Sequence, residues 1–275
     1  MCSKMNDQTS KLGNNDHEDS GNKVKKFLTE DDPLYNEVNS FTQEIYNNVL
    51  EYAEQCQTED NHWKLFYQQN DIVRFYSREV ECKDVVTDPV IGKFSIPGVT
   101  AMECAQCFFN PQCKRTWDGH LNSLDVLEHP ADDTFMLYQL QKRFWPAKQR
   151  DSLFWVHLRR LPNKDPKTSS TVLVTFNSST HPKAPPANVG NLVRSQFSGC
   201  MLCHTIQVND DKLKAQSNIT REDVRCEAIY TNQINPGGWF PKLILRGLYK
   251  QQYPQFIKTF IRFTLDYAKN KPIEF

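Results

Sequence analysis

A series of strand-like runs enclosed by two helical segments is the feature that most constrains the fold of this chain. Runs rich in β-branched and aromatic residues, bounded by turn residues, occupy 72–78, 90–96, 134–141, 152–160, 170–177, 192–207 and 224–234. A segment with apolar residues at helical spacing precedes the first run, and another follows the last. The order predicts an α+β chain, with a helix, many antiparallel strands and then a second helix.

The two helical segments each carry an apolar stripe. Asp32-Pro33 is typical of a helix start, and apolar residues then recur every three to four positions, which predicts an amphipathic helix over 32–56. From 241 to about 268 a broader stripe recurs at the same period, and we expect Pro254 to kink this second helix. Such a stripe is typical of a helix that covers a sheet, and it would also roof a cavity if the strands enclosed one.

A short helix interrupts the strands. Thr100 and Glu103 form the capping box that marks a helix start, ahead of Cys104 and Cys107. No second cysteine pair follows at the spacing of a zinc ribbon, so we interpret these two as small buried side chains. We expect neither a bound metal nor a cofactor.

The nine cysteines of the chain are expected to be reduced. An odd number scattered through 275 residues fits buried thiols better than a disulfide framework. Cys200 to His204 spells C-x-x-C-H, the motif of covalent haem attachment. That chemistry needs a flexible site near a helix, whereas this motif lies within the strand-like run 192–207, so we predict no haem.

Composition limits both function and location. With 39% hydrophobic and 24% charged residues, the chain is typical of a soluble globular protein. Its 33 basic and 33 acidic residues cancel, so no net field draws it to nucleic acid, and we expect no such partner. No run of about 18 apolar residues predicts a membrane span, and the polar N-terminus has no signal-peptide core, so we predict a cytoplasmic protein. Residues 1–29 have almost nothing to bury and are predicted to be a disordered tail.

Two tryptophans lie in proline-flanked turns that follow strand-like runs. Trp145 precedes Pro146, and Trp239 follows Pro236-Gly237-Gly238. A large amphipathic ring in a turn either packs under its own loop or stays near the surface for a partner. Two tryptophans in matched settings favour the rim of a ligand site or a surface that contacts membranes. The glycines of the second turn suit a loop that opens.

Two strand-like runs place polar side chains among apolar ones. The two-residue period puts Gln139 on the face of Leu137, and Tyr230 on the face of the small residues Cys226 and Ala228. A buried polar atom without a hydrogen-bond partner costs about 1–3 kcal/mol, so each must bond to protein, to water or to a ligand. The residues by themselves leave these three partners open.

From about Trp63 to Phe275 the chain resembles a START domain, of the lipid-transfer family related to the steroidogenic acute regulatory protein. The resembling segments are Trp63-x-Leu65 with Val73 to Val80, Lys114 to Asp118, Trp145 to Asp151, Asn235 to Trp239, and Lys271 to Phe275. Members that carry ceramide are the most similar. The resemblance implies a helix-grip fold, in which a curved antiparallel sheet wraps around a long C-terminal helix and encloses a lipid tunnel. With the helix over 32–56, this domain would occupy 30–275.

The resemblance also implies a binding site. Ceramide-carrying members hold the amide and hydroxyls of the lipid with an acidic residue, a glutamine, an asparagine and a tyrosine. Three of these fall on Asp118, Gln139 and Tyr230. Asp118 is one methylene shorter than the family's glutamate, and an ion pair with a basic neighbour is an alternative role for it. Depending on one inserted residue, the asparagine position falls on Thr175, Phe176 or Asn177.

The same resemblance assigns the two tryptophans to membrane docking. Trp145 and Trp239 match tryptophans that surround the tunnel mouth and insert into the membrane interface, a setting that suits an indole ring. We expect them to dock this domain on membranes, with Pro236 beside them. Arg150 and Asp151, next to the first turn, are interpreted as structural.

The sequence carries no recognisable catalytic set. The G-x-S-x-G, H-E-x-x-H and P-loop patterns are absent. We therefore predict a non-enzymatic lipid-transfer protein, acting as a monomer, that carries ceramide or a related sphingolipid and contacts membrane surfaces transiently. Endoplasmic reticulum and Golgi are the membranes that the resemblance implies. A carrier of phosphatidylcholine or another glycerolipid, and a lipid sensor that regulates a partner, are the alternatives.

Overall fold

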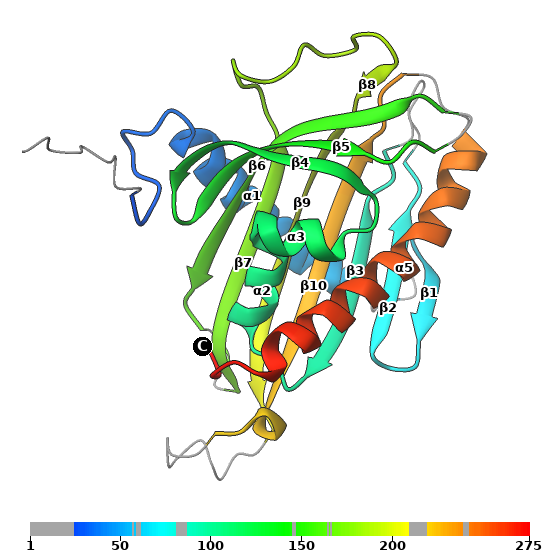
Figure 1. The fold of residues 1–275 in the computed structure, drawn as a ribbon. Coiled ribbons are helices and arrows are strands. Elements are labelled where there is room, and N and C mark those ends of the chain that lie inside the picture. The colour runs from blue at the N-terminus through cyan, green and yellow to red at the C-terminus, as the bar shows by residue number, and fades with distance from the viewer. Residues whose placement is uncertain are drawn as a thin grey trace, which may run out of the picture.

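The computed structural model describes residues 25–56, 58, 62–80, 87–144, 147–163, 165, 167–208, 219–238 and 242–275, and Figure 1 shows their arrangement. The helices are α1 (Tyr35–Gln55), α2 (Ala101–Phe109), α3 (Pro111–Trp117), the short 3-10 helix η1 (Arg221–Asp223) and α5 (Lys242–Lys269). The strands are β1 (Trp63–Gln69), β2 (Val73–Arg78), β3 (Val90–Pro97), β4 (Leu121–Ala131), β5 (Thr134–Gln141), β6 (Gln149–Leu161), β7 (Thr168–Ser178), β8 (Leu192–Arg194), β9 (Gln196–Gln207) and β10 (Val224–Asn235).

One large sheet organises the domain. Its strands follow the order β1-β2-β3-β10-β9-β7-β6-β5-β4, all antiparallel, and β8 adds to β6 in parallel. β10 connects the two halves, because it pairs along its length with β9 on one side and with β3 on the other. The sheet curves around α5, which runs along its inner face (Figure 1). The predicted helix-grip fold is confirmed.

Side chains of the sheet alternate between two apolar layers. On the inner face, Val174 and Phe176 of β7 pack in one layer with residues of α2, α3 and α5. On the outer face, Leu173 of the same strand packs with Val49 of α1. The two-residue period of one strand thus supplies both layers. The larger inner layer surrounds the cavity described below.

α1 begins later than predicted. Leu34 precedes the first helical residue and makes no side-chain cap. The Asp32 carboxylate instead accepts hydrogen bonds from the Thr29 N–H at 2.8 Å and from the Thr29 hydroxyl at 3.1 Å, so it closes the preceding turn. The apolar stripe is confirmed, since Val38 and Val49 are fully buried against the outer face.

The capping box of α2 is confirmed. The Glu103 N–H donates to Thr100 Oγ1 at 3.3 Å, and the Thr100 N–H donates to the Glu103 carboxylate at 3.0 Å. These reciprocal bonds satisfy two N–H groups at the start of the helix. Cys104 and Cys107 are fully buried on this helix, as expected of small apolar side chains.

Four elements have no counterpart in the prediction from sequence, namely β1, β4, α3 and η1. β1 and β4 are the edge strands of the sheet and bury few of their side chains, so they lack the apolar alternation that marks a strand. The short helix α3 begins at Asn110, whose side chain accepts from the Gln112 N–H at 2.8 Å. The predicted run 192–207 divides at Ser195 into β8 and β9.

α5 continues through Pro254. The proline removes one N–H from the hydrogen-bond ladder, yet the helix does not end there. Tyr253, Ile257 and Phe260 lie buried against the inner layer of the sheet. Among the described residues, no helix has both the length and the hydropathy that crossing a membrane requires.

Candidate functional site

A cavity of about 260 Å³ lies between the inner face of the sheet and α5. Alternate residues of β5, β6, β7 and β10 reach it, because every second side chain of these strands points inward. Its wall is mostly apolar and aromatic, including Phe108, Leu137, Phe154, Val156, Phe176, Phe197 and Phe256. A wall of this kind suits a ligand with a large hydrocarbon part.

Two polar side chains in this wall present carbonyl oxygens that no group in the described part of the protein satisfies. Gln139 of β5 is 6% exposed, and its Oε1 has no hydrogen-bond partner among the described residues. Asn232 of β10 lines the same cavity, and its buried Oδ1 likewise has no partner in the described part of the chain. A buried acceptor without a donor costs about 1–3 kcal/mol. Both oxygens therefore need hydrogen-bond donors from whatever fills the cavity.

Two buried tyrosines accompany Asn232. Its amide donates to the Tyr253 hydroxyl at 3.4 Å, and Tyr230 lies two positions earlier on the same face of β10. Burial raises the pKa of both phenols, that of Tyr230 well above its usual value. Both hydroxyls are therefore protonated at neutral pH and able to donate as well as accept hydrogen bonds.

Asp118 lines the cavity as half of an ion pair. The Lys114 ammonium, one helical turn earlier on α3, lies 2.8 Å from the carboxylate, and the His120 N–H donates to it at 3.1 Å. Burial by itself would raise the pKa of Asp118, but the charge and hydrogen bond of Lys114 outweigh burial and lower it below its usual value. Asp118 thus forms the ion pair that the sequence offered as an alternative, and it also lies on the cavity wall, where its contact with a ligand stays a prediction.

The loops that follow β5 and β10 meet at one end of the cavity, beside the first turns of α5 (Figure 1). Lys142, Phe144 and Lys148 from the first loop and Pro236 from the second line this end. The Arg150 Nε–H joins the two loops by donating to the Pro236 carbonyl at 3.3 Å. Because Lys142, Phe144 and Lys148 are exposed, the cavity opens to solvent here, and we call this end the mouth.

Phe176, and not Asn177, faces the cavity. The two-residue period of β7 turns Thr175 and Asn177 to the outer face, where Thr175 Oγ1 lies 3.0 Å from Thr42 Oγ1 of α1. Of the three positions that the sequence left open for the family's asparagine, Phe176 lines the cavity, and Asn177 does not, which corrects the prediction of Asn177 as a ligand-binding residue. An amide on the cavity wall comes instead from Asn232.

The predicted docking residues are described only in part. Trp145 and Trp239 lie outside the described residues, so their contact with membranes stays a prediction. Pro236 is buried and lines the mouth. After it, Gly237 has a φ of +66°, and a Cβ added there would lie 2.5 Å from the Arg194 carbonyl oxygen of β8. The loop requires glycine at this position for its backbone conformation and for its close approach to β8.

Asp151 stabilises β8, the strand against which the loop after β10 packs. Its carboxylate is fully buried and accepts two hydrogen bonds from the Arg194 guanidinium, at 2.9 and 2.8 Å. The Tyr138 hydroxyl donates to it at 2.9 Å. These bonds tie β8 to β6 and β5, so Asp151 has the structural role expected for it.

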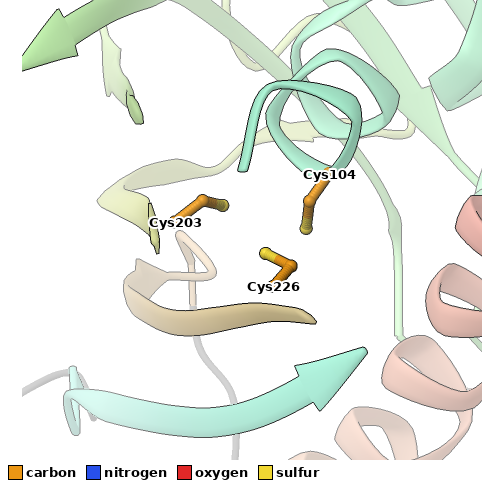
Figure 2. A group of neighbouring side chains, drawn as sticks. All are labelled: Cys104, Cys203 and Cys226. Atoms are coloured by element: carbon orange, nitrogen blue, oxygen red, sulfur yellow. The ribbon is translucent and has the colours of Figure 1, made fainter. Parts of the chain in front are cut away.

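Three cysteines converge outside the cavity lining. Figure 2 shows Cys104 of α2, Cys203 of β9 and Cys226 of β10 pointing toward one another. Their three sulfur atoms lie within 4.8 Å of one another. Hydrogen bonds among the thiols act on each pKa in both directions, and with burial the pKa of each thiol is held well above its usual value. Cys200 of the C-x-x-C-H motif faces α1, on the opposite side of the sheet from Cys203, which agrees with the interpretation against haem.

Asn232 and Tyr253 are the site residues that the sequence analysis missed. A signal for Asn232 exists, since it lies two positions after Tyr230 and must share its face. Tyr253 lies within the apolar stripe of α5, where period alone does not distinguish a ligand contact from a core residue. Lys142 and Lys148 were overlooked because the chain as a whole has no net charge.

Known proteins share the sequence pattern of this chain. A model of the START domain family matches residues 46–271. Ceramide transfer protein from Mus musculus and from Homo sapiens is 31% identical over 236 residues, which cover 86% of this chain and 37% of the relative. The chain therefore spans little more than a third of the length of these curated relatives.

Solved structures share its architecture. The crystal structure of human STARD10 matches with a TM-score of 0.60 and 19% identity, covering 81% of this chain and 80% of that one. Human StAR-related lipid transfer protein 5 matches with a TM-score of 0.59 and 14% identity, covering 83% and 99%. At these identities the likeness shows the fold alone.

Proposed function

The chain belongs to the START domain family, and we propose that its cargo is ceramide or a closely related sphingolipid, transferred between membranes. The observation that carries this choice is a pair of carbonyl oxygens on a mostly apolar wall, Gln139 Oε1 and Asn232 Oδ1, which have no hydrogen-bond partner among the described residues. Ceramide brings an amide N–H and hydroxyl groups on a body of hydrocarbon. Its donors would satisfy both oxygens, and its chains would fill the apolar remainder.

The other polar groups of the cavity complement the same ligand. The protonated hydroxyls of Tyr230 and Tyr253 are able to donate to the ceramide carbonyl or accept from its hydroxyls. The Asp118 carboxylate has acceptor capacity beyond its bond to Lys114, because each of its oxygens has two lone pairs. A neutral head group suits a cavity whose buried charges already compensate each other.

A choline phospholipid fits these groups less well. Its ester and phosphate oxygens are acceptors, and its quaternary ammonium has no N–H, so neither amide oxygen would gain a donor. The phosphate would also need an available cation, and a choline group an aromatic cage. Lys114 on the cavity wall is already held by Asp118 at 2.8 Å, and the other lining lysines, Lys142 and Lys148, lie exposed at the mouth.

The physical task of a carrier is to lower the barrier for a lipid to leave the bilayer. At about 0.8 kcal/mol per CH₂, exposing a lipid of about 30 methylenes to water costs on the order of 20 kcal/mol. An apolar cavity that receives the chains removes most of this cost. Because no bond is made or broken, we propose a carrier without catalytic activity, working between endoplasmic reticulum and Golgi membranes.

Extraction of labelled ceramide and phosphatidylcholine from the same donor vesicles tests the cargo. We expect the unmutated protein to prefer ceramide. Gln139→Ala, Asn232→Leu and Tyr230→Phe should each weaken ceramide extraction about ten- to hundredfold, because each removes a hydrogen bond that keeps buried polar groups paired. Asp118→Asn should have a smaller effect, since that carboxylate is also structural. Gln43→Ala, an exposed amide on α1, is the matched control and should extract normally.

Two outcomes would change this proposal. Preferential uptake of phosphatidylcholine by the unmutated protein would overturn the cargo and leave lipid transfer intact. Normal ceramide extraction by both Gln139→Ala and Asn232→Leu would show that the two amide oxygens do not recognise the ligand. Thermal unfolding of each variant confirms that the fold is retained.

A further inference from the structure

The cluster of Cys104, Cys203 and Cys226 lies outside the cavity lining and has no part in the proposed function. Its members belong to α2, β9 and β10, so distant parts of the chain converge on one point (Figure 2). All three side chains are fully buried, and their sulfur atoms lie within 4.8 Å of one another. A single buried thiol is explained by packing, whereas three sulfurs that face one another form a set of donor atoms.

The spacing of the sulfurs fits one soft metal ion. A metal–sulfur bond is about 2.3 Å long, so an ion at the centre of three sulfurs holds them about 4 Å apart. The observed limit of 4.8 Å is close to this spacing, and small rotations of the side chains would close the difference. Cys203 and Cys226 stand on paired strands, since Cys203 lies opposite Ala228, two positions after Cys226. The sheet therefore holds these two ligands together without the ion.

The number and type of donors select among metals. Among the described residues, no fourth cysteine, histidine or carboxylate brings a ligand atom within the same distance of all three sulfurs. Structural zinc sites have four protein ligands, and zinc sites with three protein ligands keep a water in the fourth position. This cluster is closed to bulk solvent, because each of its side chains is fully buried. Thiolates also select copper(I), a soft ion that needs no fourth ligand.

The negative charge of the coordinated sulfurs has a favourable neighbour. Cys104 is the fourth residue of α2, near the N-terminal end, where the helix dipole stabilises thiolates. In the metal-free protein the thiols are protonated, because the pKa of each is well above its usual value. Coordination therefore replaces each S–H bond by a sulfur–copper bond and releases the proton to solvent, with no change of oxidation state.

We propose that Cys104, Cys203 and Cys226 form a three-coordinate site for copper(I), which fixes α2 to β9 and β10. The sequence predicts no metal, because Cys104 and Cys107 lack a second pair at zinc-ribbon spacing. The fold supplies the partners of Cys104 from strands far along the chain. The site is independent of the cargo, since none of its three residues lines the cavity.

Titration of the reduced, metal-free protein with copper(I) tests the site, under anaerobic conditions and in competition with the chromophoric chelator bicinchoninate. We expect one tightly held ion per chain. X-ray absorption at the copper edge should show three sulfurs at about 2.3 Å. Cys203→Ala and Cys226→Ala should each weaken binding more than about a hundredfold, because loss of even an outer-shell partner costs about 10- to 100-fold.

Cys200→Ala is the matched control. Cys200 is equally buried and lies on the same strand as Cys203, but it faces α1 on the opposite side of the sheet. This variant should bind copper(I) as tightly as the unmutated protein. Copper(I) should raise the Tm of both, and it should not raise the Tm of Cys203→Ala.

Three results would overturn the site. The first is unchanged binding of copper(I) by Cys203→Ala and Cys226→Ala, and the second is a loss of binding in Cys200→Ala as large as in those two variants. The third is a copper centre with only two sulfurs in the unmutated protein, a result that does not depend on the folding of any variant.

Discussion

Some buried polar groups of this domain are paired by the protein, and others have no hydrogen-bond partner among the described residues. Asp151 is fully buried, yet it receives hydrogen bonds from Arg194 and Tyr138. Gln139 and Asn232 each keep a buried carbonyl oxygen that no described residue pairs. An unpaired acceptor costs about 1–3 kcal/mol, and these two oxygens lie on the cavity wall, where a ligand can supply the missing donors.

His157 gives the fold a pH dependence that is independent of the ligand. Burial, with help from the Arg159 charge, lowers its pKa from 6.5 to about 4. As pH falls below 6.5 the unfolded chain binds a proton that the folded chain does not, so stability is lost between about pH 6.5 and 4. We expect the free energy of unfolding to fall by about 3 kcal/mol across this window from this residue.

Urea unfolding between pH 7.5 and 4.5 checks this expectation. His157→Gln should flatten the decline with pH, whereas His62→Gln, at an exposed histidine, should leave the decline unchanged. An equally steep decline in His157→Gln would mean that other groups set the acid sensitivity.

The loop after β10, which lines the mouth, contains two glycines with an unusual backbone conformation. Gly237 and Gly238 both have positive φ, at +66° and +61°. They differ in their surroundings, because a Cβ at Gly237 would lie 2.5 Å from the Arg194 carbonyl oxygen, whereas one at Gly238 would first meet Val193 at an ordinary 3.6 Å. Gly237 is therefore required both for its backbone conformation and for lack of space for a Cβ, whereas Gly238 is required only for its backbone conformation.

This difference predicts unequal costs for the same substitution. Gly238→Ala should lower the free energy of unfolding by about 1–2 kcal/mol, the cost of a left-handed backbone for a residue with a Cβ. Gly237→Ala should lower it by a further 1–3 kcal/mol, because the added carbon must displace β8. Chemical denaturation measures both. Equal losses of unfolding free energy in the two variants would show that β8 moves to make room for the added carbon at no measurable cost.

As a whole, the molecule is a curved sheet closed by one long helix over a cavity. The outer layer packs against α1, while the inner layer is shared between protein core and cavity wall. Ligand that enters the cavity binds the folded state and not the unfolded chain. Occupancy should therefore be visible as added stability.

Thermal unfolding with a short-chain ceramide measures that coupling. At about one hundred times its Kd the ligand should add about 2.7 kcal/mol, which corresponds to a rise in Tm of roughly 5–10 °C for a domain of this size. Gln139→Ala should show a smaller rise at the same ligand concentration. A rise with phosphatidylcholine and none with ceramide would contradict the proposed cargo.

Much of this architecture was predictable because local periods and capping signals report which way side chains face. Thr100 and Glu103 predicted the start of α2, and the two-residue period placed Gln139 and Tyr230 on inward faces. β1 and β4 escaped prediction because edge strands bury few side chains and show little alternation. The predicted helix start at Asp32 was wrong, because a side chain that suits a helix cap also suits a tight turn, and here it closes the turn before α1.

By itself, the sequence determined the faces of individual strands and helices, the START family pattern and the absence of net charge. Tertiary structure alone decided which faces meet. It brought Asn232 beside Tyr253, directed toward the cavity the face of β7 that carries Phe176, and placed Lys142 and Lys148 at the cavity mouth. The reason is physical: a period is a local property of the backbone, whereas an unpaired oxygen or an uncompensated charge is defined by neighbours from distant parts of the chain.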